Sequence, residues 1–119
     1  TGVGELIARM HEARISHRDL KATNLLLRKT ASGVESYVID LDGAQHHLRR
    51  LGWHQRFCNL SRLELSSREL PSISNADRLR LLKAYLDAST APKPQWKTAW
   101  QELREITGQR ALRPKRRAA

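Results

Sequence analysis

The stretch that decides how this chain is read is residues 17–24, His17-Arg18-Asp19-Leu20-Lys21-Ala22-Thr23-Asn24. A second segment follows at residues 37–43, Tyr37-Val38-Ile39-Asp40-Leu41-Asp42-Gly43. Apolar runs stand on both sides of a polar, glycine-bearing segment at residues 29–36, a pattern that predicts a β-hairpin. Antiparallel strands return the chain to its starting level, so we expect Asn24 and Asp40 to lie side by side.

These residue types suit the transfer of a phosphoryl group to an alcohol. Such a reaction needs an oriented hydroxyl, magnesium on the phosphates and positive charge near the transferred group. Asp19 is the candidate catalytic base, because a carboxylate on a tight loop can face the hydroxyl directly. Asn24 and Asp40 offer the hard oxygen ligands that Mg²⁺ prefers. Lys21 lies two residues beyond Asp19, so an extended loop would direct both side chains to the same side, where Lys21 stabilises the phosphate.

Residues 17–24 resemble the catalytic loop of the protein-kinase-like superfamily, H-R-D-L-x-x-x-N, and residues 40–42 resemble a variant of its D-F-G metal motif. The resemblance implies ATP and Mg²⁺ as cofactors. It also implies that Leu26 forms part of the floor under the adenine ring and that Lys21 contacts the nucleotide phosphate. Asp42 stands where protein kinases carry glycine, and we interpret it as an exposed turn residue rather than a second metal ligand.

The later sequence indicates a branch of that superfamily. The A-P-E and D-x-W-S-x-G motifs of protein kinases do not occur. The order of residues 52–55, 59–63 and 77–86 instead resembles the Kdo/WaaP lipopolysaccharide kinases, with the likeness spanning roughly residues 4–90. This resemblance implies phosphorylation of a sugar hydroxyl in the lipopolysaccharide inner core, on the cytoplasmic side of the inner membrane.

Two other functions stay open at this point. One is a protein or aminoglycoside kinase of the same superfamily, although aminoglycoside kinases usually carry H-G-D and therefore differ at Arg18. The other is a catalytically silent binding module with a basic surface. The chain carries 22 Lys and Arg residues against 12 Asp and Glu, a net charge of +10. This charge suits peripheral contact with an anionic membrane. It suits nucleic acid as well, which the resemblance makes the less favoured partner.

The fold class that we predict is mainly helical α+β, the C-terminal lobe of a protein-kinase-like fold with a small β-hairpin carrying the metal-binding residues. Residues 1–108 form this lobe. Residues 109–119, rich in arginine, form a basic disordered tail. No glycine-rich phosphate loop and no lysine-bearing strand precede the catalytic loop, so we expect the N-terminal lobe to be missing and residues 1–119 alone to be nearly inactive. The oligomeric state is not predicted.

Helical periodicity predicts four helices, over residues 2–14, 55–65, 77–88 and 96–107, with Gly108 as the last stop signal. We expect Asn59 to satisfy backbone groups of the catalytic loop. Trp96 and Trp100 lie one turn apart on an apolar face, which favours burial in the core. No apolar run reaches the ~20 residues of a membrane-spanning helix.

The sequence contains two further groups of polar residues that are able to bind ligands. The spacing of three histidines and the single cysteine, His46, His47, His54 and Cys58, does not match a structural zinc site, and we predict no zinc. Arg49 and Arg50 follow the second motif closely enough to meet an anionic substrate.

Overall fold

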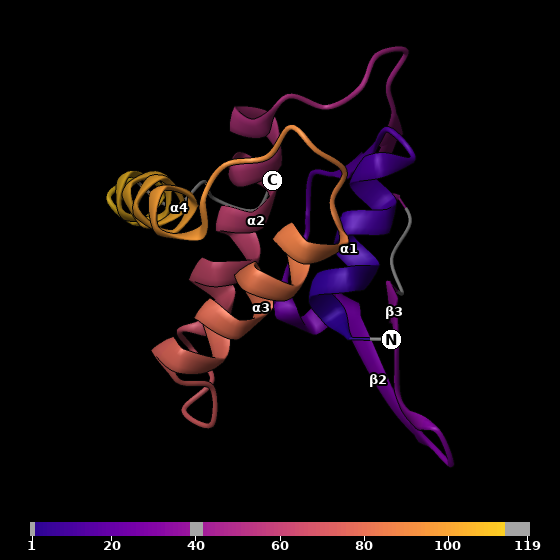
Figure 1. Cartoon of the computed structure of the whole chain (residues 1–119). Coiled ribbons are helices and arrows are strands. Elements are labelled where there is room, and N and C mark those ends of the chain that lie inside the picture. The colour runs from indigo at the N-terminus through magenta and orange to yellow at the C-terminus, as the bar shows by residue number, and fades with distance from the viewer. Residues whose placement is uncertain (1, 39–41, 114–119) are drawn as a thin grey trace.

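The computed structural model describes residues 2–38 and 42–113. Over these residues the chain forms four α-helices, a single turn of 3-10 helix and two small antiparallel sheets (Figure 1). The mainly helical α+β class is therefore confirmed. The α-helices are α1 (Val3–Glu12), α2 (Trp53–Ser67), α3 (Asn75–Ala88) and α4 (Trp96–Ala111).

The predicted hairpin is present. Strand β2 (Leu25–Thr30) pairs with β3 (Gly33–Val38), with Leu25 opposite Val38 at the open end and Thr30 opposite Gly33 at the turn. Gly33 has a φ of 136°, a conformation that residues with a side chain rarely adopt. In Figure 1 the hairpin projects away from the helices. The second sheet pairs β1 (Ile15–His17) with β4 (Ala44–His46), which joins the start of the catalytic loop to the chain that follows the hairpin.

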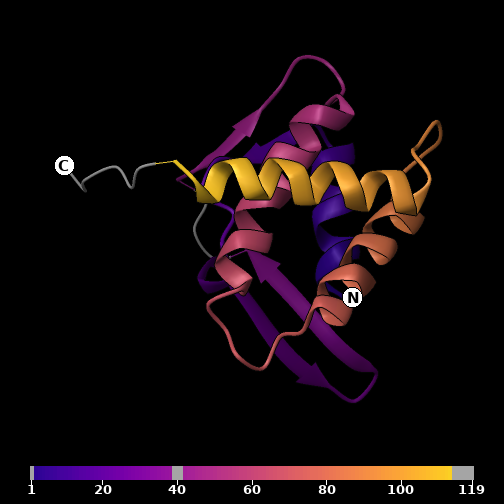
Figure 2. The same ribbon diagram turned by 90° about the vertical axis from the view of Figure 1, so that its left-hand side faces the viewer.

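The helices pack in two pairs, α1 against α3 and α2 against α4 (Figure 2). Each pair buries an apolar face, and together these faces form one core. Gly4 of α1 lies so close to α3 that an added Cβ would stand 2.5 Å from the carbonyl oxygen of Leu81. The largest fully buried apolar side chains of the core are Ile7, Leu20, Phe57, Leu82 and Tyr85.

Helix α3 begins with a complete capping box. The Ser74 side chain accepts a hydrogen bond from the backbone N–H of Asp77, and the Asp77 carboxylate accepts one from the backbone N–H of Ser74. The sequence lacks the long glutamate that usually fills the second role, and the shorter aspartate fills it here. The reciprocal bonds satisfy two backbone donors and so define where the chain turns into α3.

Two expectations for the last helix are corrected. The helix does not stop at Gly108 but runs to Ala111, because Arg110 in its last turn donates to Ser61 Oγ at 3.0 Å and to the Cys58 carbonyl at 3.3 Å. Trp96 and Trp100 are only half-buried and pack at the edge of the core. Cations cover their outer faces, since Lys83 Nζ lies 4.2 Å from the Trp96 ring centre.

Candidate functional site

The segment between β1 and β2 is a tight turn whose backbone donors bond residues on either side of it. The Arg18 N–H donates to the Gly43 carbonyl at 3.0 Å, which extends the β1–β4 pairing by one bond. The Asp19 N–H donates to Nδ1 of His17 at 3.1 Å. The fully buried His17 ring thus holds the turn from inside, and the Asp19 side chain is directed outward.

Three of the predicted site residues come together at this turn. Asn24 Nδ2 donates to the Asp19 carbonyl at 2.7 Å and lies 3.4 Å from Asp19 Oδ2. Lys21 Nζ lies 3.2 Å from Asp19 Oδ1. The Asp19 side chain is 37% exposed, so its carboxylate is open to a substrate. The carboxylate of Asp19, the ammonium of Lys21 and the amide of Asn24 therefore lie close together.

Helix α2 holds this turn in place. Asn59 Oδ1 accepts from the His17 N–H at 3.2 Å, and Asn59 Nδ2 donates to the His17 carbonyl. Ser66, two turns further along α2, accepts from the Ala22 N–H at 2.9 Å. The prediction that Asn59 satisfies backbone groups of the loop is confirmed. Backbone donors buried without partners would destabilise the fold, so these bonds fix where the loop lies.

A buried polar chain continues behind Asn59. His11 lies between Asn59 Oδ1, 2.7 Å from its Nε2, and the Tyr85 hydroxyl, 2.6 Å from its Nδ1. The amide oxygen can only accept, so the neutral ring carries its proton on Nε2 and accepts from Tyr85. Burial lowers the pKa of His11 to about 4, and this outweighs the hydrogen bond to Asn59. His11 is therefore neutral at pH 7.

The chain of bonds ends at an ion pair between a buried arginine and a partly exposed glutamate. The Arg56 guanidinium, 1% exposed, donates to the Tyr85 hydroxyl at 3.4 Å and to Glu12 Oε2 at 3.1 Å. Partial desolvation acts to raise the pKa of Glu12, but bonds from Thr90 and Arg56 lower it to about 2. Arg50 also reaches this end, where it donates to Thr90 Oγ1 at 2.8 Å. This pairing with the fold contradicts the expectation that Arg50 faces a substrate.

Gly43 is required by the close approach of β4 to the catalytic loop. A Cβ atom at this position would stand 2.8 Å from Cε1 and 3.0 Å from Nδ1 of His17. The ring cannot move away easily, because it is fully buried and its Nδ1 accepts from Asp19. Gly43 thus permits the arrangement that positions Asp19.

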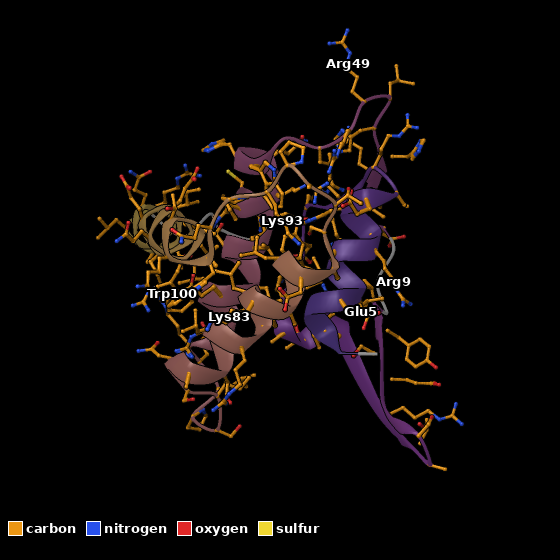
Figure 3. The ribbon with its side chains drawn as sticks, viewed as in Figure 1. Glu5, Arg9, Arg49, Lys83, Lys93 and Trp100 are labelled. Carbon is orange, nitrogen blue, oxygen red and sulfur yellow. The ribbon has the colours of Figure 1, made fainter. Side chains whose placement is uncertain are left out.

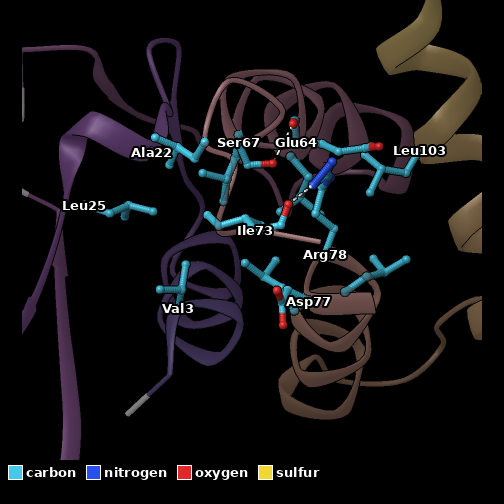
Figure 4. Close-up of a pocket in the computed structure, with 14 residues that line it drawn as sticks. Val3, Ala22, Leu25, Glu64, Ser67, Ile73, Asp77, Arg78 and Leu103 are labelled. Carbon is cyan, nitrogen blue, oxygen red and sulfur yellow. Dashed lines mark hydrogen bonds between the residues drawn. The ribbon is translucent and has the colours of Figure 1, made fainter. Parts of the chain in front are cut away.

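Two cavities adjoin the loop. One is a polar cleft of about 310 Å³, lined by Arg18, Asp19, Asp42, Gly43 and Arg62. The other, of about 290 Å³, lies between α1, α2, α3 and α4 and is almost entirely apolar (Figure 4). Ala22 and Leu25 line its wall on the loop side, and Leu103 lines it from α4. The catalytic loop therefore separates a polar space from an apolar one.

Two predicted site residues are not placed by the structure. Asp40 lies outside the described residues, and so does the side chain of Leu26. The backbone of Leu26 pairs with Tyr37 in the hairpin. Within residues 2–38 and 42–113, no three His, Cys, Asp or Glu side chains form a cluster that could hold a metal ion. No helix in the same ranges is long and apolar enough to cross a bilayer.

Comparison with known proteins identifies the family of this chain. The sequence model of the lipopolysaccharide kinase (Kdo/WaaP) family matches residues 1–85. The chain belongs to this family. Among its relatives, a 3-deoxy-D-manno-octulosonic acid kinase of Pasteurella multocida (strain Pm70) is 36% identical over 64 residues, which are 54% of this chain and 25% of that protein. The protein of the same name from Mannheimia succiniciproducens is 38% identical over 64 residues, again 54% and 25%.

A third relative with that name, from Haemophilus influenzae, is 40% identical over 40 residues, which are 34% of this chain and 17% of that protein. The chain thus spans about a quarter or less of the curated relatives that it matches. Family membership makes it a kinase-family chain linked to lipopolysaccharide biosynthesis. ATP and Mg²⁺ are implied by the family.

Several residues that build this Kdo/WaaP-family site were missed by sequence reasoning. His11 breaks an otherwise apolar helix face, and Arg56 stands directly before Phe57 of the α2 stripe. Polar residues within a buried face need partners, and this is the signal that could have identified both. No sequence pattern near His11 indicates that Tyr85 is the common partner of His11 and Arg56, because Tyr85 lies 74 residues from His11.

Proposed function

We propose that this chain carries the catalytic loop of an ATP- and Mg²⁺-dependent kinase that phosphorylates a sugar hydroxyl of the lipopolysaccharide inner core. The observation that carries the proposal is the convergence of Asp19, Lys21 and Asn24 on a turn held from behind by α2. The names of the Pasteurella, Mannheimia and Haemophilus relatives support the sugar acceptor. In this proposal, the chain up to the end of α4 at Ala111 is the C-terminal lobe of a protein-kinase-like fold, three residues longer than residues 1–108 expected from the sequence.

The residues present fit a magnesium ion. The Asn24 amide donates through Nδ2 to the Asp19 carbonyl, which fixes its orientation. Its Oδ1 receives no hydrogen bond from any described residue, so this oxygen remains available to a hard cation. Asn24 and Asp40 would hold the ion. When bound, Mg²⁺ supplies positive charge that offsets the charge on the nucleotide phosphates.

The other roles follow from what each side chain can do. Asp19 accepts a hydrogen bond from the acceptor hydroxyl and takes its proton as the oxygen attacks the γ-phosphorus of ATP. The bond between the γ-phosphorus and the β,γ-bridging oxygen breaks, and ADP leaves. Lys21, 3.2 Å from Asp19, is near enough to stabilise negative charge on the transferred phosphoryl group. Leu26 would lie under the adenine ring. The lipopolysaccharide acceptor places the reaction at the inner face of the inner membrane, where the basic surface can contact anionic lipid.

A chimaera tests this proposal. Residues 1–85 would replace the corresponding region of the Pasteurella multocida relative, since the match covers only 25% of that protein. We expect labelled phosphate from ATP to reach lipopolysaccharide core sugar, and to reach neither a generic protein nor an aminoglycoside. Asp19→Asn should lower the rate about 100-fold or more, the usual contribution of a general base. Glu69→Gln, which changes an exposed carboxylate elsewhere, is the matched control and should keep the rate.

Label in the aminoglycoside or the protein instead would favour those acceptors. A chimaera that folds but transfers nothing, and that binds nucleic acid in a salt-sensitive way, would favour the silent basic module. Equal rates for Asp19→Asn and Glu69→Gln would contradict the role of Asp19 as base.

A further inference from the structure

The polar cleft beside Asp19 is lined by an arginine of α2. Arg62 of α2 lines the cleft together with Arg18, Asp19, Asp42 and Gly43. Within the described part of the chain, the Arg62 side chain has no ion pair or side-chain hydrogen bond, although it is half-buried. By contrast, Arg56 of α2 is paired with Glu12, and Arg68, the C-cap residue of α2, is paired with Glu64. Arg62 is therefore a cation at the cleft for which residues 2–38 and 42–113 supply no paired side chain.

Helix periodicity explains why Arg62 faces the catalytic loop. Asn59 and Ser66 both bond the backbone of this loop from α2. Arg62 lies three residues after Asn59 and four before Ser66, so the three side chains share one face of the helix. The two outer residues anchor the loop at His17 and at Ala22. The middle one reaches the cleft beside Asp19.

Among the residues that the structure describes, the cleft carries a net positive charge in spite of its two carboxylates. Lys21 lies 3.2 Å from Asp19 and offsets its charge. Arg18 and Arg62 line the cleft together with Asp42. The described residues at the cleft therefore include three cations, Lys21, Arg18 and Arg62, and the two carboxylates of Asp19 and Asp42. Further cations lie behind Arg62, because Arg110 bonds Ser61 on α2. Burial lowers the pKa of Arg110, and the nearby charges of Arg62 and Arg113 lower it further.

We propose that Arg62 is the anchor of an anion subsite that binds the carboxylate of an acidic acceptor sugar and so presents its hydroxyl to Asp19. This inference rests on the proposed function, because it assigns the acceptor side of the same cleft. An arginine fork pairs with a carboxylate through two parallel hydrogen bonds, which fix orientation as well as affinity. Arg18, exposed at the same cleft, adds positive charge. The subsite selects acidic sugars over neutral ones.

Binding to the full chain tests the subsite without requiring phosphoryl transfer. The probes are 3-deoxy-D-manno-octulosonic acid, its methyl ester and inorganic phosphate, titrated by NMR at fixed ionic strength. We expect the acid to bind about tenfold more tightly than the ester, the lower end of what a charge-assisted hydrogen bond contributes. Arg62→Gln should abolish this preference. The control is Arg9→Gln, which removes an equal charge from an exposed side chain of α1 that pairs with Glu5 (Figure 3).

Each outcome decides the inference. Equal binding of acid and ester by the unaltered chain, or a preference that survives Arg62→Gln, overturns it. Phosphate binding more tightly than the sugar acid, and lost in Arg62→Gln, overturns the carboxylate assignment in favour of a phosphate group. An equal loss in Arg9→Gln overturns it too, because the preference would then be a property of net charge.

The two proposals can fail separately. If the chimaera transfers phosphate to core sugar and Arg62→Gln changes neither its KM nor acid binding, the kinase function stands and the subsite falls. If the chimaera transfers to no sugar while the full chain loses acid binding in Arg62→Gln, the subsite stands and the kinase function falls. If both stand, Arg62→Gln in the chimaera should raise the KM for the acidic acceptor by about tenfold and leave kcat nearly unchanged.

Discussion

The two sides of the catalytic loop differ in how their polar groups are satisfied. On the side that faces α2, the loop backbone is bonded to Asn59 and Ser66, and a buried chain of side chains supports Asn59 from behind. On the side that faces the cleft, Asp19 is more than one-third exposed and Arg62 has no ion pair among the described residues. The difference shows that the residues holding the site need not be those that carry its chemistry.

This comparison predicts that substitutions on the two sides have different consequences. Changes on the α2 side should lower the free energy of unfolding. Changes on the cleft side, Asp19→Asn and Arg62→Gln, should alter transfer or binding and leave stability within about 0.5 kcal/mol, as is usual for surface positions. Chemical denaturation of the full chain can measure all of these variants under one condition.

The largest effect is expected from Asn59→Ala. The substitution leaves the His17 backbone groups and the His11 ring without their partner in a buried place, and each unsatisfied group costs about 1–3 kcal/mol. We expect a loss of about 4 kcal/mol in urea denaturation. Asn59→Asp keeps the acceptor oxygen and should lose less, which preserves the test if Asn59→Ala does not fold. Asn75→Ala, at an exposed position of α3, should be nearly neutral; a similar loss there would contradict the anchoring role.

The next largest effect is the response of stability to acid. His11 has a pKa of about 4 in the folded chain against 6.5 as its ordinary value, so the unfolded chain binds more protons between these values. The contribution of His11 to the free energy of unfolding is fully present above pH 6.5 and is lost as the pH falls through about 4. The difference between the two pKa values of His11 corresponds to about 3 kcal/mol of the free energy of unfolding, since one pKa unit corresponds to about 1.4 kcal/mol.

Denaturation at pH 7, 5.5 and 4 measures this loss. His11→Gln should flatten the dependence over this range, and His54→Gln, at an exposed ring, should not. Glu12, with a pKa of about 2, adds its own acid sensitivity only below its ordinary value of 4.5. An unchanged slope in His11→Gln would mean that the acid response arises elsewhere.

A smaller effect is expected from Gly43→Ala. The new methyl group would stand 2.8 Å from the His17 ring, and overpacking of this kind costs about 1–3 kcal/mol. Gly108→Ala is the matched control, because nothing lies within 4 Å of its Cβ position and alanine favours the helix by about 0.5–1 kcal/mol. Opposite signs in the two variants are expected. Loss of stability in both would show that the close approach to His17 is not the cause.

Much of the fold could be predicted because it depends on short-range patterns. The hairpin followed from apolar runs around a glycine-bearing turn, and all four α-helices followed from their periodicity. The predicted end of α4 was wrong. Glycine ends a helix only where no residue beyond it is held in place by contacts with the rest of the fold. Arg110 is held by contacts to α2, 49 and 52 residues away in sequence, so the helix continues through Gly108.

The candidate site was predicted in part for the same reason. Asp19, Lys21 and Asn24 lie within six residues of one another, and the structure brings them together. The pairing of Asn24 with Asp40 stays a prediction, because Asp40 lies outside the described residues. Arg50 was assigned to a substrate from its position after the motif, whereas it bonds Thr90. A charged residue in a sequence does not reveal whether its partner belongs to the fold or to a ligand.

The sequence by itself determined the chemistry that the catalytic loop can offer, its hairpin and the helices that surround it, because residue type and local spacing act over a few residues. Only the tertiary structure decided which polar residues support that loop and which remain open to a substrate. Asn59 and Arg62 stand three residues apart on one helix, yet one is bonded to the loop and the other faces the cleft. That division depends on how α2 lies against the loop, and long-range packing sets it.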